Sequence, residues 1–254
     1  MPGPEVRHVA LSHNGKDLVI ALGEGNDDKW TLPVWSTETR KPQKAVPQQS
    51  PCEVVVFSPD DKLLASGDRK GAVRLWQWPS RREVKGPPNH TESIQSIAFS
   101  RDSKLLATAS MDLTVQLWDM VGDKPHGKAP QVPSRVRTLA FSPNGKFLAT
   151  GSIDGTARLW DVATGVQIGP AMRHDQFVNA VAFHPDGKLL ATGSFDGSLR
   201  LWPVPALVSD LHEMGLRTWV SLGLELNAQG AVQAIPCERW RQLREELRAL
   251  KARH

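Results

Sequence analysis

A repeat of 42 residues is the feature that most constrains how this chain can fold. The phrases "FSPDDKLLASGDRKGAVRLWQ", "FSRDSKLLATASMDLTVQLWD", "FSPNGKFLATGSIDGTARLWD" and "FHPDGKLLATGSFDGSLRLWP" begin at Phe57, Phe99, Phe141 and Phe183. Each phrase holds two apolar runs separated by a tight turn, and each reaches a tryptophan at the end of the second run. These tryptophans are Trp76, Trp118, Trp160 and Trp202. A period of this length indicates one supersecondary unit per copy, stacked into an array.

Each copy is predicted to form a small antiparallel sheet. In the copy that contains Trp118, alternating apolar and polar residues predict strands over 96–100, 105–109 and 114–118, with tight turns between them. The stretch after the tryptophan leaves room for one further short strand. One such sheet cannot cover both of its own faces, so neighbouring copies are expected to stack face to face in a radial array.

A fifth and weaker copy precedes the other four. "VRHVALSHNGKDLVIAL" matches the first half of the phrase and "LPVWSTETR" matches the tryptophan strand, with Trp35 lying 41 residues before Trp76. "GEGNDDKWT" is interpreted as an insertion in the second turn, and Pro33 as a sign of an edge or a distortion. The domain of repeats is therefore predicted over 1–205, in units of about 5–47, 48–89, 90–131, 132–173 and 174–205.

Residues 206–254 do not continue the repeat and are predicted to form a mostly helical C-terminal extension. We expect one helix over 210–222, a short strand in "AVQAI" and a second helix from Pro236. The second helix carries an apolar stripe of Trp240, Leu243, Leu247 and Leu250, which is expected to dock on the repeats or on the preceding helix.

Composition and motifs exclude several functional classes. The net charge of +4 is too small to indicate nucleic-acid binding by itself. No apolar run reaches the roughly 18 residues of a membrane span, and the first residues lack the apolar core of a signal peptide. Cys52 and Cys237 form no CxxC pair, and no phosphate-binding, metal-binding or kinase motif occurs. The sequence therefore predicts a cytoplasmic protein without metal, cofactor or membrane contact.

The period, the turn chemistry and the terminal Trp-Asp together resemble WD repeats, over about residues 6–205. That resemblance implies an all-β propeller, a fold of typically four to eight blades, with five recognisable blades here. Five blades at a seven-blade pitch leave about 103° open. We therefore expect an incomplete ring whose last blade is covered by the C-terminal segment, with five-fold closure as the alternative. Blade faces left uncovered would promote self-association.

The stretch "WVSLGLELNAQGAVQAIPCERWRQLREELRAL" resembles the C-terminal extension of WD-repeat proteins from planctomycete-type bacteria. In those proteins a protein kinase domain often precedes the propeller. The resemblance implies a bacterial protein that could be the C-terminal part of a larger signalling protein.

The family resemblance also implies a hydrogen-bonded chain of four side chains in each blade: a histidine, a Ser or Thr, an aspartate and the tryptophan. Two blades match at every position, with His90, Thr108, Asp112 and Trp118 in one, and His174, Thr192, Asp196 and Trp202 in the other. A third blade keeps Thr150, Asp154 and Trp160 but has Val132 in place of the histidine. The blade of Trp76 keeps Ser66 but has Gln48 and Lys70, so no complete network is expected there.

An Asp–His–Thr set also resembles a catalytic triad. A catalytic site has no reason to recur at a 42-residue interval, and the hydroxyl lies in the middle of a predicted strand. Catalysis requires a nucleophile exposed to a cleft. The sets are therefore interpreted as structural, and no catalytic residue is predicted.

The resemblance places partner contacts on the rim that carries the second turns and the starts of the first strands. The residues before the turn aspartates are Met111, Ile153 and Phe195, with Arg69 at the same position in the blade of Trp76, and those at the strand starts are Arg135, Arg137, Phe177 and Asn179. Exposed apolar residues around one rim would indicate a partner, whereas the alternative is that each packs on its neighbouring blade.

The sequence thus favours a non-catalytic scaffold that binds a protein or peptide on this rim. The alternative is nucleic-acid or anionic-surface binding through the C-terminal helix, which is rich in arginine. Glutamates alternate with those arginines, a pattern that favours an ordinary solvated helix face, so nucleic acid is not the expected partner.

Overall fold

The computed structural model describes residues 5–23, 30–204, 224–226 and 232–234. The chain divides into two compact units, Met1–Trp202 and Pro203–His254. In the second unit, β20 (Leu224–Leu226) and β21 (Val232–Ala234) pair antiparallel, and β21 is the short strand predicted in "AVQAI". The helices predicted over 210–222 and from Pro236, with the apolar stripe of the second, lie outside the described residues.

The first unit consists of five antiparallel sheets that follow one another along the chain, called sheet one to sheet five. Sheet one holds β1 (Val6–Leu11), β2 (Asp17–Leu22), β3 (Thr31–Ser36) and β4 (Pro42–Pro47). Sheet two holds β5 (Cys52–Phe57), β6 (Leu63–Asp68), β7 (Val73–Gln77) and β8 (Arg82–Val84). Sheet three holds β9 (Ile94–Phe99), β10 (Leu105–Ser110), β11 (Val115–Asp119) and β12 (Lys124–Pro125). Sheet four holds β13 (Val136–Phe141), β14 (Phe147–Ser152), β15 (Thr156–Asp161) and β16 (Gln167–Arg173). Sheet five holds β17 (Val178–Phe183), β18 (Leu189–Ser194) and β19 (Leu199–Pro203).

These strands follow the alternation in the sequence. In sheet three the three long strands lie within two residues of their predicted positions, and the short fourth strand β12 follows the tryptophan. The described residues contain strands and no α-helix, so the part of the chain that holds the repeats is all-β as predicted.

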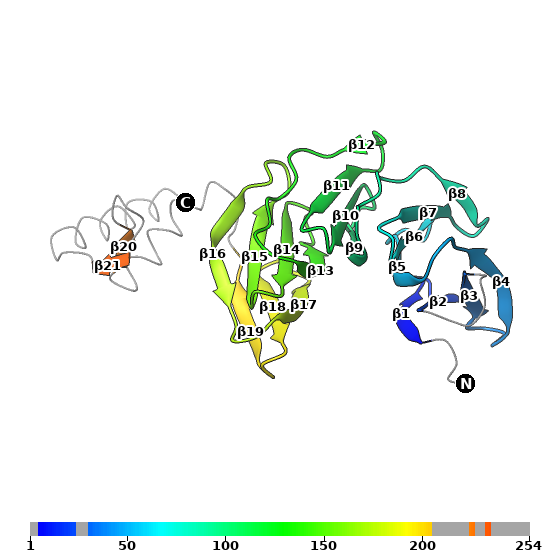
Figure 1. Cartoon of the computed structure of the whole chain (residues 1–254), viewed down its shortest axis with the longest axis horizontal. Coiled ribbons are helices and arrows are strands. Elements are labelled where there is room, and N and C mark those ends of the chain that lie inside the picture. Colours follow the sequence, from blue (N-terminus) through cyan, green and yellow to red (C-terminus); the bar gives the residue numbers. More distant parts are fainter. Residues whose placement is uncertain (1–4, 24–29, 205–223, 227–231, 235–254) are drawn as a thin grey trace. The chain divides into compact units, whose positions relative to one another are not determined.

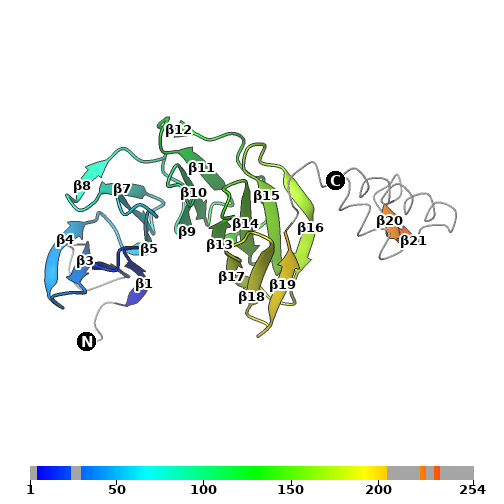
Figure 2. The same cartoon turned by 180° about the vertical axis from the view of Figure 1, so that it is seen from behind.

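Neighbouring sheets pack face to face in chain order, as Figures 1 and 2 show from opposite sides. The first strands β1, β5, β9, β13 and β17 contact one another in succession. We call the face of a sheet that packs on the following sheet its forward face, and the opposite one its rear face. Val73 and Leu75 on the forward face of sheet two, for example, share an apolar core with Ile97 and Leu106 on the rear face of sheet three.

The tryptophan that ends each phrase lies on a rear face. Trp76 packs among the forward residues of sheet one, and Trp160 packs among those of sheet three. Both indoles are buried, as is Trp118 in the junction between sheets two and three. The recurring tryptophan therefore fills the space between two sheets, and burial of so large an apolar ring stabilises each junction.

The row of sheets does not close on itself among the described residues. No strand of sheet one makes extensive contact with a strand of sheet five. Leu199 and Leu201 on the forward face of sheet five are 71% and 60% exposed, whereas Val115 and Leu117, their counterparts in sheet three, are buried. At the other end, Val9 and Leu11 on the rear face of sheet one are also exposed. The row thus has two apolar end faces.

The turn between the second and third strands requires a left-handed backbone at one position. Gly71, Gly155 and Gly197 occupy it in three sheets with φ of +87°, +75° and +81°. A Cβ at Gly71 would lie 2.4 Å from the carbonyl oxygen of His90, so that site tolerates no side chain. Sheet three has Leu113 there, with φ of 66°, which is a strained conformation for a leucine.

We predict that Leu113→Gly stabilises the protein by about 1 kcal/mol, because glycine adopts this backbone conformation without the steric penalty. Leu113 is exposed, so little packing is lost. Urea unfolding of the variant and the parent would measure the change. Leu113→Ala is the matched control, since it shortens the side chain and keeps the strain. Equal stability of the two variants would contradict the explanation.

Candidate functional site

The side chains of the predicted network in sheet three lie together. Nδ1 of His90 lies 3.1 Å from a carboxylate oxygen of Asp112, and Nε2 lies 2.8 Å from the hydroxyl of Thr108. A carboxylate only accepts hydrogen bonds, so Nδ1 carries the proton and Thr108 donates to Nε2. Trp118 packs close by but makes no hydrogen bond to Thr108 among the described residues.

Sheet five repeats this arrangement and extends it to the tryptophan. Nε2 of His174 lies 2.7 Å from the hydroxyl oxygen of Thr192. The same oxygen accepts a hydrogen bond from the indole N–H of Trp202 at 2.8 Å. Nδ1 of His174 is 3.0 Å from the Ser198 hydroxyl and 3.5 Å from a carboxylate oxygen of Asp196. Each buried polar group therefore has a partner, which is what a structural network requires.

In sheets two and four, which lack the histidine, an arginine on the third strand pairs with a carboxylate in the second turn or at the end of the strand before it. In sheet four, Arg158 contacts Asp154 at 3.0 Å, while Trp160 donates to Thr150 at 3.0 Å. In sheet two the acid is Asp68, which is not the residue at the expected turn position; its carboxylate contacts Arg74 at 2.9 Å.

Asp68 also accepts the backbone N–H groups of Lys70 and Ala72 at 3.0 and 2.8 Å, and it is almost fully buried. Gln48 takes the place of the histidine and donates to Ser66 at 3.2 Å. The network of the other repeats is incomplete in sheet two, and a different polar network, which the sequence did not lead us to expect, is present in its place. An arginine occupies the same position of the third strand in both sheets, but also in sheet five, where Arg200 donates to the carbonyl of Arg173, so the arginine by itself did not indicate this network.

Burial and hydrogen bonding shift the pKa values of the network in sheet three. Burial lowers the pKa of His90, and the neighbouring Asp112 carboxylate opposes that shift only in part. Burial raises the pKa of Asp112, but the hydrogen bonds from Thr114 and Thr91 outweigh it and leave the pKa below its ordinary value. The folded protein therefore holds a neutral imidazole beside an ionised carboxylate.

We predict that the free energy of unfolding decreases as the pH falls from about 7.5 to 5.5. The unfolded chain takes up a proton on His90 near its ordinary pKa, while the folded protein does so only at lower pH, so acid favours unfolding. His90→Gln, which copies Gln48 of sheet two, should make this dependence shallower. Urea unfolding at several pH values would measure both slopes, and equal slopes would contradict the role of His90.

These networks do not present a catalytic arrangement. Thr108 and Thr192, the hydroxyl-bearing residues next to the histidines, are buried within their sheets. Among the described residues, no three His, Cys, Asp or Glu side chains are placed to hold a metal ion. Burial also raises the pKa of the Cys52 thiol to about 12, so this cysteine is not a nucleophile at neutral pH.

The rim residues proposed from the sequence lie along one edge of the row. In each of sheets two to five, the rim residue in the second turn donates its backbone N–H to a carbonyl at or near the start of the first strand. The pairs are Arg69 to Pro51, Met111 to Ser93, Ile153 to Arg135 and Phe195 to Phe177. These four bonds hold the second turns beside the strand starts in sheets two to five. The side chain of Arg69 also contacts Glu53 at 2.8 Å.

The rim side chains differ in exposure, and three of them form a cluster. The rings of Phe177 and Phe195 stack with centroids 4.7 Å apart, and the guanidinium of Arg137 lies 5.5 Å from the centroid of Phe177. Phe195 is 63% exposed and Ile153 44%, whereas Met111 is half-buried. Arg135 and Asn179 are exposed without joining the stack. The apolar rim residues of sheets four and five are thus exposed to solvent.

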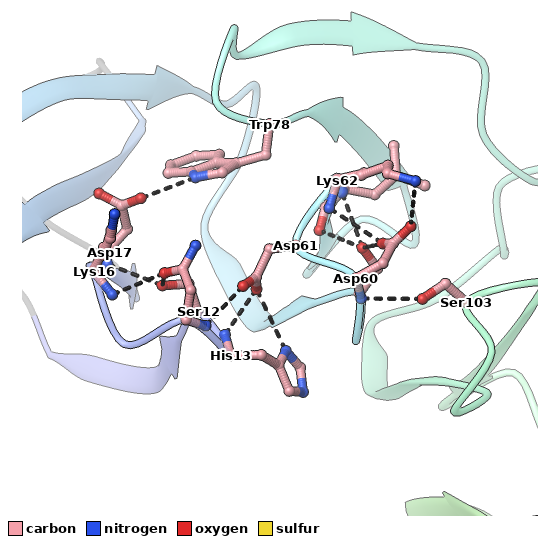
Figure 3. A network of polar contacts seen from close by, with 12 residues as sticks. Ser12, His13, Lys16, Asp17, Asp60, Asp61, Lys62, Trp78 and Ser103 are labelled. Carbon is pink, nitrogen blue, oxygen red and sulfur yellow. Dashed lines mark hydrogen bonds and ion pairs between the residues drawn. The ribbon is translucent and has the colours of Figure 1, made fainter.

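The opposite rim carries contacts that tie neighbouring sheets together, as Figure 3 shows. The carboxylate of Asp61 accepts the backbone N–H groups of His13 and Asn14 at 2.7 Å each, which joins the first turns of sheets one and two. Trp78 donates to Asp17 at 3.0 Å across the same junction. These residues lie in different repeats and meet only in the fold, so no motif in the sequence marks them.

A hollow also opens near these first turns. Residues from all five sheets line it, namely His13, Pro59, Phe99, Arg101, Phe141, Ser142, Pro143 and Pro185. Its lining is mixed, without a convergent set of charged groups. It therefore offers a weaker binding surface than the aromatic cluster on the other rim.

Repeated antiparallel sheets stacked face to face, each with a tryptophan on its rear face, and with a polar network at the second turn of sheets two to five, define a β-propeller architecture of the WD class. The chain belongs to the WD-repeat family, because the family model "WD domain, G-beta repeat" matches residues 44–77, 82–119, 128–161 and 170–203, more than half of the chain. No curated protein matches the chain. Proteins with these repeats generally mediate protein–protein interactions and are typically non-catalytic. No helix among the described residues is long and apolar enough to cross a membrane.

Proposed function

We propose that this protein is a non-catalytic scaffold that binds a protein or peptide on the rim of the second turns, over sheets four and five. The observation that carries the proposal is the stack of Phe177 on the largely exposed Phe195, with Arg137 beside it. Aromatic and arginine side chains contribute most of the binding energy in protein interfaces. Their cluster therefore favours a ligand with an apolar anchor.

The charges on this rim suggest which charge the ligand carries next to its apolar anchor. Arg135 and Arg137 are exposed, and the nearby Asp154 already pairs with Arg158. An acidic side chain next to an aromatic or aliphatic anchor would complement both features. We propose a peptide segment of this composition as the ligand.

Selection from a displayed peptide library would test this function. Peptides selected on the whole protein should lose at least about tenfold in affinity for Phe195→Ser, which corresponds to about 1.4 kcal/mol. Val121→Ser is the control, because Val121 is also exposed but follows the third strand of sheet three, at the opposite rim. Fluorescence anisotropy would supply the affinities. Equal binding by parent and Phe195→Ser would place the site elsewhere.

We also propose that residues 1–205 are the interaction domain, in the five units given above, of a cytoplasmic bacterial signalling protein. The resemblance of the C-terminal stretch to the extensions of kinase-linked WD-repeat proteins supports this proposal. Sequencing of the coding region upstream would test it, and a kinase domain in the same reading frame is the expected finding.

A further inference from the structure

The forward face of sheet five is an apolar surface built to be covered. Its strands β17, β18 and β19 place six alanine and leucine residues on this face, together with Gly193 and Pro203: Ala180, Ala182, Leu189, Ala191, Leu199 and Leu201. In sheets two, three and four, the residues that match Leu199 and Leu201 pack into the junction with the next sheet and are fully or almost fully buried. Exposure of such a face to water is unfavourable, because burial of apolar side chains, as at the equivalent positions of the other sheets, stabilises the protein.

None of the six residues carries a charge, so the face can lie against a copy of itself without repulsion between like charges. The net charge of the whole chain is only +4, which adds little long-range repulsion between two copies. Its shape also suits a two-fold partner. Alanines lie on the first strand β17 and leucines on the third strand β19, with β18 between them.

We propose that two copies of this protein form a dimer through the forward faces of their fifth sheets, related by a two-fold axis along β18. This rotation sets Leu199 and Leu201 of one copy against Ala180 and Ala182 of its partner, so that large side chains meet small ones. Facing sheets pack in this way, with side chains of the two inner faces interdigitating. Two-fold contacts are also the commonest in homo-oligomers.

A head-to-tail contact between the forward face of sheet five and the rear face of sheet one is the rival arrangement. It would reproduce the internal junctions, but it would extend the row to ten sheets. Propeller rings hold four to eight blades, so a second row of five sheets would overlap the first in the same ring. In the two-fold arrangement the two rows curve away from each other, which avoids the overlap.

Analytical ultracentrifugation of the whole chain over a range of concentrations tests the proposal. We expect a mass that approaches twice the 28.0 kDa of the chain and does not rise further. Leu201→Asp should leave the protein monomeric, because the charge would be buried without a partner in the interface. Leu11→Asp places the same charge at an exposed position on the rear face of sheet one and should dimerise like the parent.

Four results would overturn the proposal. A parent that stays monomeric at every concentration would show that the face is free or covered within one chain. Loss of association in Leu11→Asp would indicate the head-to-tail contact, as would growth beyond a dimer. Undiminished dimerisation of Leu201→Asp would place the interface elsewhere. Thermal melts of both variants must match the parent, and Leu199→Asp provides a second variant of the same face if Leu201→Asp melts early.

Cross-linking provides an independent readout. Ala191 lies on the central strand β18, so Ala191→Cys should be joined to its own counterpart by a short bis-maleimide, in a Cys237→Ser background. Cys52 is buried with a pKa raised to about 12 and should not react. The same substitution at Val9, on the rear face of sheet one, should give no cross-linked dimer. A dimer cross-linked at Val9 and not at Ala191 would contradict the two-fold arrangement.

Discussion

Leu117→Ala is expected to destabilise the protein by about 2–5 kcal/mol, whereas Leu201→Ala should cost the monomer less than about 1 kcal/mol. The two leucines occupy the same position in their repeats, on the forward faces of sheets three and five. Leu117 is 3% exposed in the core shared with sheet four, while Leu201 is 60% exposed at the end of the row. The large loss at Leu117 combines lost apolar burial with a cavity between two sheets.

Urea unfolding at a concentration low enough to keep the protein monomeric would measure both changes. Leu75→Ala in sheet two serves as a second internal variant, because Leu75 is fully buried against sheet three. If Leu201→Ala were as destabilising as the two internal variants, the forward face of sheet five would have to be covered within a single chain.

Asp112→Ala is expected to destabilise the protein by about 2–3 kcal/mol. The carboxylate contacts the buried His90 and accepts hydrogen bonds from the exposed Thr91 and Thr114, so its removal takes the carboxylate partner from a buried imidazole and loosens the turn. Asp68→Ala should have a similar effect in sheet two, because it removes a buried carboxylate that accepts from Arg74 and from the backbone N–H groups of Lys70 and Ala72.

Lys70→Ala is the control for both acids. Lys70 stands at the position in sheet two that Asp112 occupies in sheet three, but its side chain is exposed, and we expect a change below about 1 kcal/mol. Urea unfolding of the three variants would compare them. An effect of Lys70→Ala as large as that of Asp68→Ala would show that the network of sheet two is wrongly assigned.

The repeat period predicted the strands and their order closely, because each strand has an alternating pattern and each turn has its own residues. The strands of sheet three lie within two residues of the predicted ranges for that reason. The contacts of His90 with Thr108 and Asp112 were also predictable, since these residue types at fixed offsets satisfy one another's hydrogen bonds, whereas the predicted bond from Trp118 to Thr108 is not among those of the described residues.

The network of sheet two was not predicted, because a search by position expects the acid in the turn itself. Asp68 lies two residues earlier, on the strand. From there its carboxylate accepts hydrogen bonds from the backbone N–H of Lys70 in the turn and from the side chain of Arg74. The stack of Phe177 and Phe195 was not predictable either, although both residues were named separately. Their contact depends on the backbone bond that brings the strand start to the turn. Pairwise geometry of this kind is set by the fold and not by the spacing of residues.

The central claim is that five WD sheets form a row whose first and last sheets do not close on each other. Thiol reactivity of single cysteines tests it most directly, in a Cys237→Ser background and at a concentration that keeps the chain monomeric. Val9→Cys and Leu199→Cys probe the two end faces, and their buried counterparts Val55→Cys and Val115→Cys are the matched controls. We predict that both end-face cysteines react with a maleimide at close to the rate of the unfolded chain, and that both controls react only on unfolding. Protection of both end-face cysteines in the folded monomer would contradict the account and would show a closed ring.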